Sequence, residues 1–182
     1  AANPRETASA ATLVGVLLKQ KKWQEALATL DAMARKGPMR QTDKRHLKGL
    51  VHVKHGETAL EEKQFETALP SARLGLKLLP DFPPAISLAA RALQQSGQTP
   101  KAIKLILKKW KIAPHPQLSH LLLQMVASHP KQKQLKLIRK LPAILPAHAE
   151  SHLALAQAAM AQKEWDEARK AVKPALARNE PR

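Results

Sequence analysis

The sequence contains no cysteine and no tyrosine, and each absence excludes several classes of protein. Without cysteine the chain cannot form disulfides, Cys-ligated zinc sites or iron–sulfur centres, and it has no thiol nucleophile. Its aromatic residues amount to three Trp and two Phe among 182 residues. A core must therefore be built mainly from Leu and Ala, which favour helices over strands. The composition predicts an all-helical protein.

Long apolar runs and clustered glycines are also missing. An uncharged, mainly apolar stretch near the start, residues 8–18, covers 11 residues, whereas a membrane-spanning helix needs about 20. The six glycines are scattered, so neither a phosphate-binding loop nor a dinucleotide fingerprint can form. On a helix, the neighbouring carboxylates of Glu61 and Glu62 would point in different directions, which disfavours an acid–base pair. We therefore expect a non-enzymatic protein.

An internal repeat is the main positive feature of the sequence. Trp23 is followed by a small residue, an apolar residue and a proline at offsets of 3, 7 and 15 residues. The same order follows Phe65, and related orders start at Thr99, Lys131 and Trp165, the last with its proline one position later. These starts are 42, 34, 32 and 34 residues apart. A period near 34 residues is typical of the tetratricopeptide repeat (TPR), a pair of packed helices. The small residues are Ala26, Ala68, Ala102 and Ala168, and we expect each to be buried where two helices approach closely.

The repeats define the expected architecture. We predict an all-α, TPR-like right-handed superhelix of about five helix pairs, forming a single domain over residues 1–182. The helix pairs are expected near residues 5–20 and 22–36, 42–62 and 64–79, 83–96 and 99–112, 116–128 and 131–145, and 147–162 and 164–178. The corresponding repeat units cover about residues 5–38, 42–80, 83–114, 116–146 and 147–181.

Two stretches of the chain resemble a particular family of repeat proteins. The first covers residues 89–118 and includes Trp110 and the sequence Pro114-His115-Pro116. The second covers residues 150–169 and contains a later Trp-Asp-Glu-Ala-Arg motif. Both are similar to the soluble repeat region of the HemY-like proteins of proteobacteria, over roughly residues 20–178.

The resemblance implies a cellular setting. HemY-like proteins have an N-terminal hydrophobic anchor in the inner membrane and a cytoplasmic repeat domain, and they are associated with haem (porphyrin) biosynthesis without an established catalytic activity. We therefore expect this chain to be a soluble fragment of an anchored scaffold, with the anchor outside the sequence. It would lie at the cytoplasmic face of the inner membrane.

Positive charge is concentrated in a part of the chain that has no acidic residue. The chain has a formal net charge of +17, and residues 82–149 contain no Asp or Glu. Lysines three or four residues apart share one face of a helix, and stacked repeats would place two such stripes side by side. We expect the following residues to form a basic patch for an anionic partner: Lys101, Lys104, Lys108, Lys111, Lys133, Lys136, Arg139 and Lys140.

Two kinds of anionic partner fit such a patch. One is a protein, either acidic or an enzyme of the haem pathway, and the other is an anionic membrane surface. Specific nucleic-acid binding is not expected, because it commonly needs exposed aromatic rings for stacking. We expect Trp23, Phe65 and Trp165 to be used in repeat packing, which leaves only Phe82 and Trp110 for such a role.

A second surface is expected on the first helices of the third and fourth units, which would line the concave side of the array. Its candidates are Arg91, Gln94, Gln95, His120 and Gln124. These side chains donate and accept hydrogen bonds but include no nucleophile or paired carboxylates. They favour a groove that holds a peptide backbone over one that activates water.

Eight histidines leave a haem or porphyrin carrier as the alternative function. With Cys and Tyr absent, His or Met would have to supply an axial ligand. His148 and His152 are four residues apart and would share a helical face, as would His52 and His55 at three apart. Neither pair has a third ligand nearby in the sequence. We therefore predict no metal site and no required cofactor, with His148 and His152 as weak candidates for haem or a metal.

Overall fold

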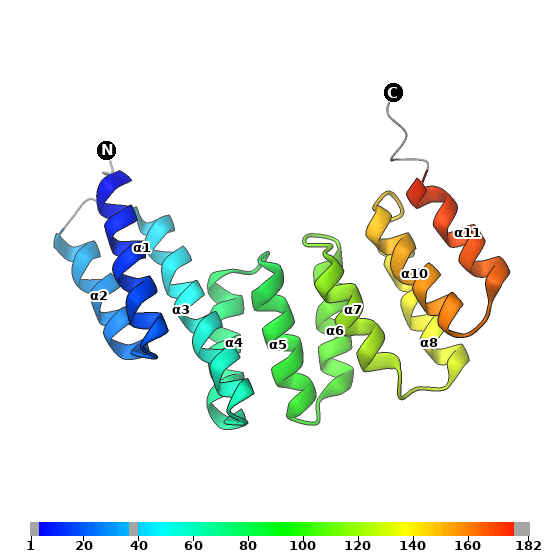
Figure 1. The fold of residues 1–182 in the computed structure, drawn as a ribbon, viewed down its shortest axis with the longest axis horizontal. Helices are drawn as coiled ribbons and strands as arrows, with labels where there is room; N and C mark the ends of the chain where they lie inside the picture. Colours follow the sequence, from blue (N-terminus) through cyan, green and yellow to red (C-terminus); the bar gives the residue numbers. More distant parts are fainter. Residues whose placement is uncertain (1–3, 37–39, 177–182) are drawn as a thin grey trace. The chain divides into compact units, whose positions relative to one another are not determined.

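The computed structural model describes residues 4–36 and 40–176, which form eleven helices and no strand (Figure 1). This confirms the all-α, TPR-like fold. Pro38 and Pro181, which end two of the expected units, lie outside the described residues. The helices are α1 (Pro4–Lys19), α2 (Trp23–Lys36), α3 (Gln41–Glu61), α4 (Phe65–Leu78), α5 (Pro83–Gln95), α6 (Thr99–Trp110), α7 (Pro116–Val126), α8 (Lys131–Ile138), α9 (Lys140–Ile144), α10 (Ala149–Ala161) and α11 (Trp165–Leu176).

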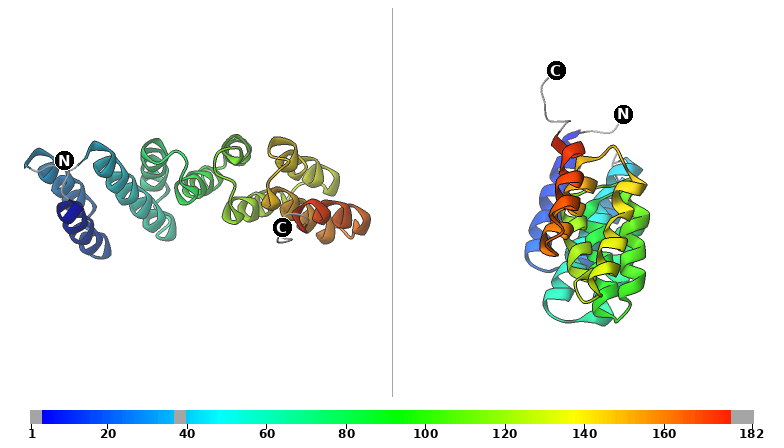
Figure 2. Two further views of the ribbon diagram at one scale, coloured as in Figure 1. Left: turned by 90° about the horizontal axis from the view of Figure 1, so that it is seen from above. Right: turned by 90° about the vertical axis from the view of Figure 1, so that its right-hand side faces the viewer.

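The chain divides into two compact units. Unit 1 covers residues 1–96 and contains α1 to α5, and unit 2 covers residues 97–182 and contains α6 to α11. The boundary falls between α5 and α6, inside the third expected helix pair. Within unit 1, α3 packs along α4, and within unit 2, α10 packs along α11 (Figure 2).

One expected helix is divided in two. The sequence predicts a single helix over residues 131–145, but the structure breaks it between Ile138 and Lys140 into α8 and α9. Pro142 explains the break, because it has no N–H to donate to the carbonyl of Ile138 and its ring crowds that carbonyl. The other expected helices begin and end within a few residues of the observed bounds.

The alanines of the repeat lie where helices meet. Ala26, Ala68 and Ala102 have no exposed surface, and Ala168 is 6% exposed. The prediction that these residues are buried at helix contacts is confirmed.

Glycine has a similar role at the contacts of α3. Gly75 of α4 is buried, and a Cβ added there would lie 2.9 Å from Cγ2 of Val53 on α3. Gly56 of α3 is buried too, and an added Cβ would lie 2.8 Å from Cδ2 of Leu88 on α5. Both distances are shorter than carbon contacts allow, so the missing side chains permit the close packing of these helices.

The aromatic residues do not all pack as expected. Trp23 is half-buried and stacks on His55, with ring centroids 5.1 Å apart, which agrees with a role in packing. Phe65 and Trp165 hold the same repeat position as Trp23 but are 39% and 56% exposed, so only part of each ring is packed. Trp110, which the sequence left available for stacking, is fully buried. Burial differs at one repeat position because it depends on which helices surround each residue.

The turns between paired helices share a left-handed residue. Gly97 has φ +73°, and Lys21, Lys63 and Lys163 occupy the corresponding turns with φ between 58° and 64°. Glycine takes this conformation without strain, whereas a residue with a Cβ pays about 1–2 kcal/mol. Lysine therefore holds a position that would suit glycine in three of the turns.

Backbone hydrogen bonds explain why the turns keep this conformation. After α3, Gln64 N–H donates to the carbonyl of Ala59 (2.7 Å), and Lys63 N–H donates to that of Leu60 (3.1 Å). This is the Schellman arrangement, which satisfies the last carbonyls of a helix. The same pair of bonds closes α1 and α10.

We predict that Ala68→Leu lowers the free energy of unfolding by roughly 1–3 kcal/mol, because the larger side chain overfills a contact with no free space. Urea unfolding followed by circular dichroism measures the change. Ala28→Leu on the exposed face of α2 is the matched control and should change stability by less than about 0.5 kcal/mol. An unchanged stability for Ala68→Leu would contradict the close contact.

We also predict that Lys63→Gly raises the free energy of unfolding by about 1 kcal/mol, because it removes left-handed strain from the turn. The control is Lys136→Gly on the exposed face of α8, where glycine should instead lower stability by about 1 kcal/mol. If both substitutions destabilise the protein equally, the turn is not strained.

Candidate binding groove

Helix α6 has one buried face and one basic face. Its buried residues are Ala102, Ile103, Ile106 and Trp110, at spacings that place them on the inner side of a helix. The lysines of α6 that were expected to share a face, at positions 101, 104 and 108, are exposed. The helix therefore presents ammonium groups beside an apolar stripe that continues into the core of unit 2.

A buried hydrogen bond ties the end of α6 to α10. Nε1 of Trp110 donates to Oγ of Ser151 over 2.8 Å, and neither residue has exposed surface. A buried indole N–H needs such a partner. Trp110 therefore anchors α6 within unit 2, which is why it is not available for stacking on a ligand.

A groove lies beside α6. Within the described residues, α6 makes contacts with α7 and α9 but none with α8. The space between α6 and the α8–α9 wall has a volume of about 800 Å³. We call it the basic groove; its lining residues are Pro100, Ile103, Lys104, Leu107, Lys108, His129, Lys133, Leu137, Lys140, Ala143 and Ile144.

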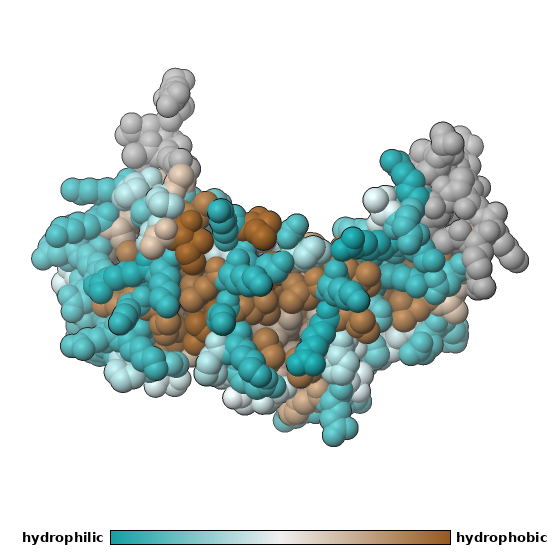
Figure 3. All heavy atoms as spheres, turned by 180° about the vertical axis from the view of Figure 1, so that it is seen from behind, coloured by the Kyte–Doolittle hydropathy of each residue, from teal (hydrophilic) through white to brown (hydrophobic). Residues whose placement is uncertain are grey.

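The basic groove combines an apolar floor with positive charge. Its lining contains four lysines and no carboxylate, and these four lysines form no ion pair with the described residues. In Figure 3, which views the protein from the side of α6 and α8, apolar surface is bordered by hydrophilic side chains. Four unpaired ammonium groups around one hollow favour an anionic ligand.

Half of the expected basic patch lies on this groove. Lys104, Lys108, Lys133 and Lys140 line it. The other four residues do not: Lys101 donates to Oε1 of Gln98 (2.8 Å), Lys111 and Lys136 are exposed elsewhere, and Arg139 forms an ion pair.

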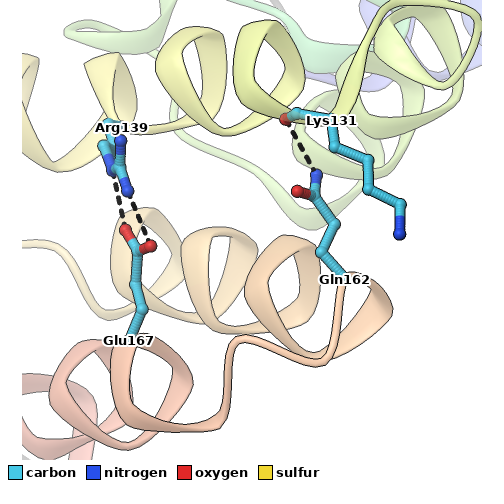
Figure 4. A network of polar contacts seen from close by, with 4 residues as sticks. All are labelled: Lys131, Arg139, Gln162 and Glu167. Atoms are coloured by element: carbon cyan, nitrogen blue, oxygen red, sulfur yellow. Dashed lines mark hydrogen bonds and ion pairs between the residues drawn. The ribbon is translucent and has the colours of Figure 1, made fainter.

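Arg139 joins two helices instead of facing a ligand. Its Nε and Nη2 each donate to the carboxylate of Glu167 on α11 over 2.7 Å (Figure 4). These hydrogen bonds lower the pKa of Glu167 and raise that of Arg139. A second link lies nearby, where Nε2 of Gln162 donates to the carbonyl of Lys131 over 3.1 Å. Together they attach α8 to the α10–α11 pair.

The candidates on the first helices fall in different units. Arg91, Gln94 and Gln95 are in unit 1, whereas His120 and Gln124 are in unit 2 and hydrogen-bond to each other over 3.0 Å. Arg91 and Gln95 line a separate hollow of about 380 Å³. The other residues that line it are Glu57, Leu60 and Glu61.

Three of the histidines have structural roles. His115 and His148 are the N-caps of α7 and α10, and Nδ1 of each accepts a hydrogen bond from the backbone N–H two residues later. Nε2 of His152 lies 2.7 Å from the carbonyl of Pro146. The pair His148 and His152 is therefore engaged with backbone groups and does not fit a preformed two-ligand site.

The other candidate pair lies within unit 1. His55 stacks on Trp23, and its Nδ1 lies 3.3 Å from Oγ of Ser71. Burial lowers the pKa of both His52 and His55. No group of three or more His, Asp or Glu side chains among the described residues could hold a metal ion.

None of the described helices has the length and apolar character needed to cross a membrane.

The apolar floor of the groove is the feature that the sequence reasoning missed. Ile103 and Leu107 are one turn apart on α6 and border the lysine stripe, and Leu137 lies opposite on α8. An isoleucine and a leucine at this spacing are a visible signal in the sequence. The signal was not used, because a hollow between α6 and the α8–α9 wall depends on how separate helices pack.

The sequence and the fold were compared with known proteins. No family model matches the sequence, and no curated relative is similar to it. A crystal structure of MamA has a TM-score of 0.50 at 15% identity and covers 99% of this chain and 98% of its own. MamA from Desulfovibrio magneticus RS-1, from residue 41 onward, has a TM-score of 0.48 at 16% identity, with complete coverage of both chains. YrrB, described as a TPR protein with an unusual peptide-binding site, has a TM-score of 0.48 at 11% identity, covering 96% and 87%. The chain therefore has a TPR-like helical-repeat fold.

We predict that Arg139→Gln destabilises the protein by about 0.5–1 kcal/mol at neutral pH, the usual range for a bidentate pair that is partly exposed. Because the pKa of Glu167 is lowered on folding, the pair stabilises the protein above the ordinary pKa of 4.5 and loses this effect as the pH falls below it. The difference between wild type and variant in urea unfolding should therefore shrink between pH 7 and pH 3. Lys131→Gln is the control and should show no such pH dependence; a constant difference for Arg139→Gln would contradict the ion pair.

Proposed function

We propose that this protein is a non-enzymatic interaction scaffold that binds an acidic partner protein in the basic groove of unit 2. The supporting observation is the arrangement of Lys104, Lys108, Lys133 and Lys140 around an apolar floor without a carboxylate in the lining. The TPR-type fold fits this role because stacked helix pairs offer long surfaces for binding.

The charges of the groove favour binding over chemistry. Four ammonium groups donate hydrogen bonds but cannot accept a proton while charged. Their mutual repulsion is relieved when carboxylates of a partner lie among them, and the apolar floor excludes water from those contacts. Binding should therefore weaken as salt increases, yet retain an apolar contribution that salt does not screen.

We further propose a cellular setting from the resemblance to HemY-like proteins. The repeat domain would work at the cytoplasmic face of the inner membrane, where an anchor outside this sequence would hold it. Its acidic partner would be an enzyme of haem biosynthesis. The sequence features that support this setting are the segment Pro114-His115-Pro116 and the motif that begins at Trp165.

Charge reversal tests the groove directly. We expect the triple variant Lys104→Glu, Lys108→Glu, Lys133→Glu to lose binding of fluorescein-labelled poly-L-glutamate at low salt, measured by fluorescence anisotropy. The matched control reverses three exposed lysines of the same unit outside the groove, Lys111, Lys131 and Lys163. Both variants have the same net charge, so equal loss in both would contradict a specific groove. Folding of each variant is checked by circular dichroism.

The same variants test the setting in cells. Chemical cross-linking of the full-length protein, followed by mass spectrometry, should recover acidic proteins with wild type and the control but not with the groove variant. Recovery of haem-pathway enzymes would support the finer proposal. Two results together would overturn the protein partner in favour of a membrane surface. The protein would sediment with anionic vesicles only when the groove lysines are present, and the groove variant would keep its protein cross-links.

A haem or porphyrin carrier is the alternative from the sequence. Titration with haemin, followed through the Soret band, separates the two functions. If the protein is a scaffold, we expect no stoichiometric shift of the Soret band that depends on His148 and His152, because both side chains interact with backbone groups. A stoichiometric shift that is lost in His148→Ala, His152→Ala, or in His129→Ala within the groove lining, would favour the carrier.

A further inference from the structure

The basic groove has the length of a short helix. Its α6 wall runs from Pro100 to Lys108, which spans roughly 12 Å at 1.5 Å per residue. Floor residues Ile103 and Leu107 lie one helical turn apart, and Leu137 lies on the opposite wall. A ligand that fills this floor needs apolar groups spaced about one turn apart.

The lysines stand on both walls of the groove. Lys104 and Lys108 are one turn apart on α6, whereas Lys133 and Lys140 are seven residues apart on the α8–α9 wall. An amphiphile with a single anionic headgroup places its charge at one end and can meet only part of this set. A ligand with carboxylates on both sides of an apolar stripe can approach all four.

The chemistry of the lining also decides the backbone conformation of a peptide ligand. The lining side chains are Lys, His and apolar residues, and the backbone groups of α6 and α8 are used within those helices. An extended peptide would place its own N–H groups over the apolar floor without acceptors, at a considerable cost. A helix satisfies its backbone internally and avoids this cost.

We propose that the basic groove binds an acidic amphipathic α-helix of the partner protein. Apolar side chains at positions i, i+3 or i+4, and i+7 of that helix contact Ile103, Leu107 and Leu137, and carboxylates on both of its edges pair with the four lysines. This inference rests on the proposed function and specifies the structure of the segment that is bound.

A synthetic peptide tests the inference on the whole chain. The probe is an Ala-rich peptide of about 16 residues, long enough for helix formation, with Leu at positions i, i+4, i+7 and i+11 and Glu on both edges. The first control has the same composition in a scrambled order, which removes the apolar stripe. The second control has two central prolines, which prevent the helix. Binding is measured by fluorescence anisotropy at two salt concentrations.

Protein variants identify the site of binding. The first groove variant removes charge from three exposed positions and should not affect folding; it combines Lys104→Gln, Lys108→Gln and Lys133→Gln. The second groove variant, Leu107→Ala with Leu137→Ala, removes two half-buried side chains from the floor. The folding of this double variant is checked by circular dichroism and urea unfolding. The matched controls are Lys111→Gln, Lys131→Gln, Lys163→Gln for charge. For apolar surface, Leu74→Ala, Leu153→Ala changes exposed leucines outside the groove.

The expected result is that the amphipathic peptide binds at least about tenfold more tightly than either control peptide, a difference of about 1.4 kcal/mol. Both groove variants should lose this preference, and both control variants should keep it. The charge variant alone decides the outcome if the floor variant does not fold.

Other outcomes overturn the inference in distinguishable ways. Equal binding of the scrambled peptide, still lost in the lysine variant, would contradict the helix but leave the acidic partner of the proposed function. Tighter binding of the proline peptide would indicate an extended ligand instead. Failure of all three peptides and of poly-L-glutamate would contradict both proposals. Displacement of the amphipathic peptide by sodium dodecanoate alone would assign the groove to a lipid. Self-association that depends on protein concentration and is lost in the lysine variant would assign the groove to a second copy of the chain.

Discussion

Close contact between helices at small side chains is the constraint on which the rest of the structure depends. With few aromatic residues, the protein cannot fill wide gaps between helices, so the helices have to approach closely. Alanine at positions such as Ala68 and Ala102, and glycine at Gly56 and Gly75, removes the atoms that would otherwise hold them apart. These contacts recur along the chain with the repeat, and they leave the opposite helix faces free for charge.

Those free faces carry the lysines, and part of them lines a groove. In unit 2, α6 contacts α7 and α9 but not α8, just as α2 does not contact α4 in unit 1. The groove between α6 and the α8–α9 wall is lined by apolar side chains as well as lysines. The net charge of the lining is high because residues 82–149 contain no carboxylate to neutralise it. Function is therefore proposed where lysines and apolar side chains line one hollow.

The polar links within unit 2 show how an apparent site residue can be structural. Arg139 has the charge and spacing of the basic patch, yet its guanidinium pairs with Glu167, 28 positions along the chain. Trp110 has the character of a stacking residue, yet its indole is buried against Ser151. Both partners lie on the α10–α11 pair, and nothing in the local sequence around Arg139 or Trp110 identifies them.

The sequence by itself determined the helical class, the period of the repeat, the buried alanines and the exposed lysines, because each depends on composition or on spacing along one helix. It did not indicate that Lys21, Lys63 and Lys163 share the left-handed conformation of Gly97. Tertiary structure alone decided the groove and the pairing of Arg139, because these depend on which side chains from distant segments meet. A helix pattern specifies which face is polar; only the packing of neighbouring helices decides whether that face surrounds a hollow or another residue.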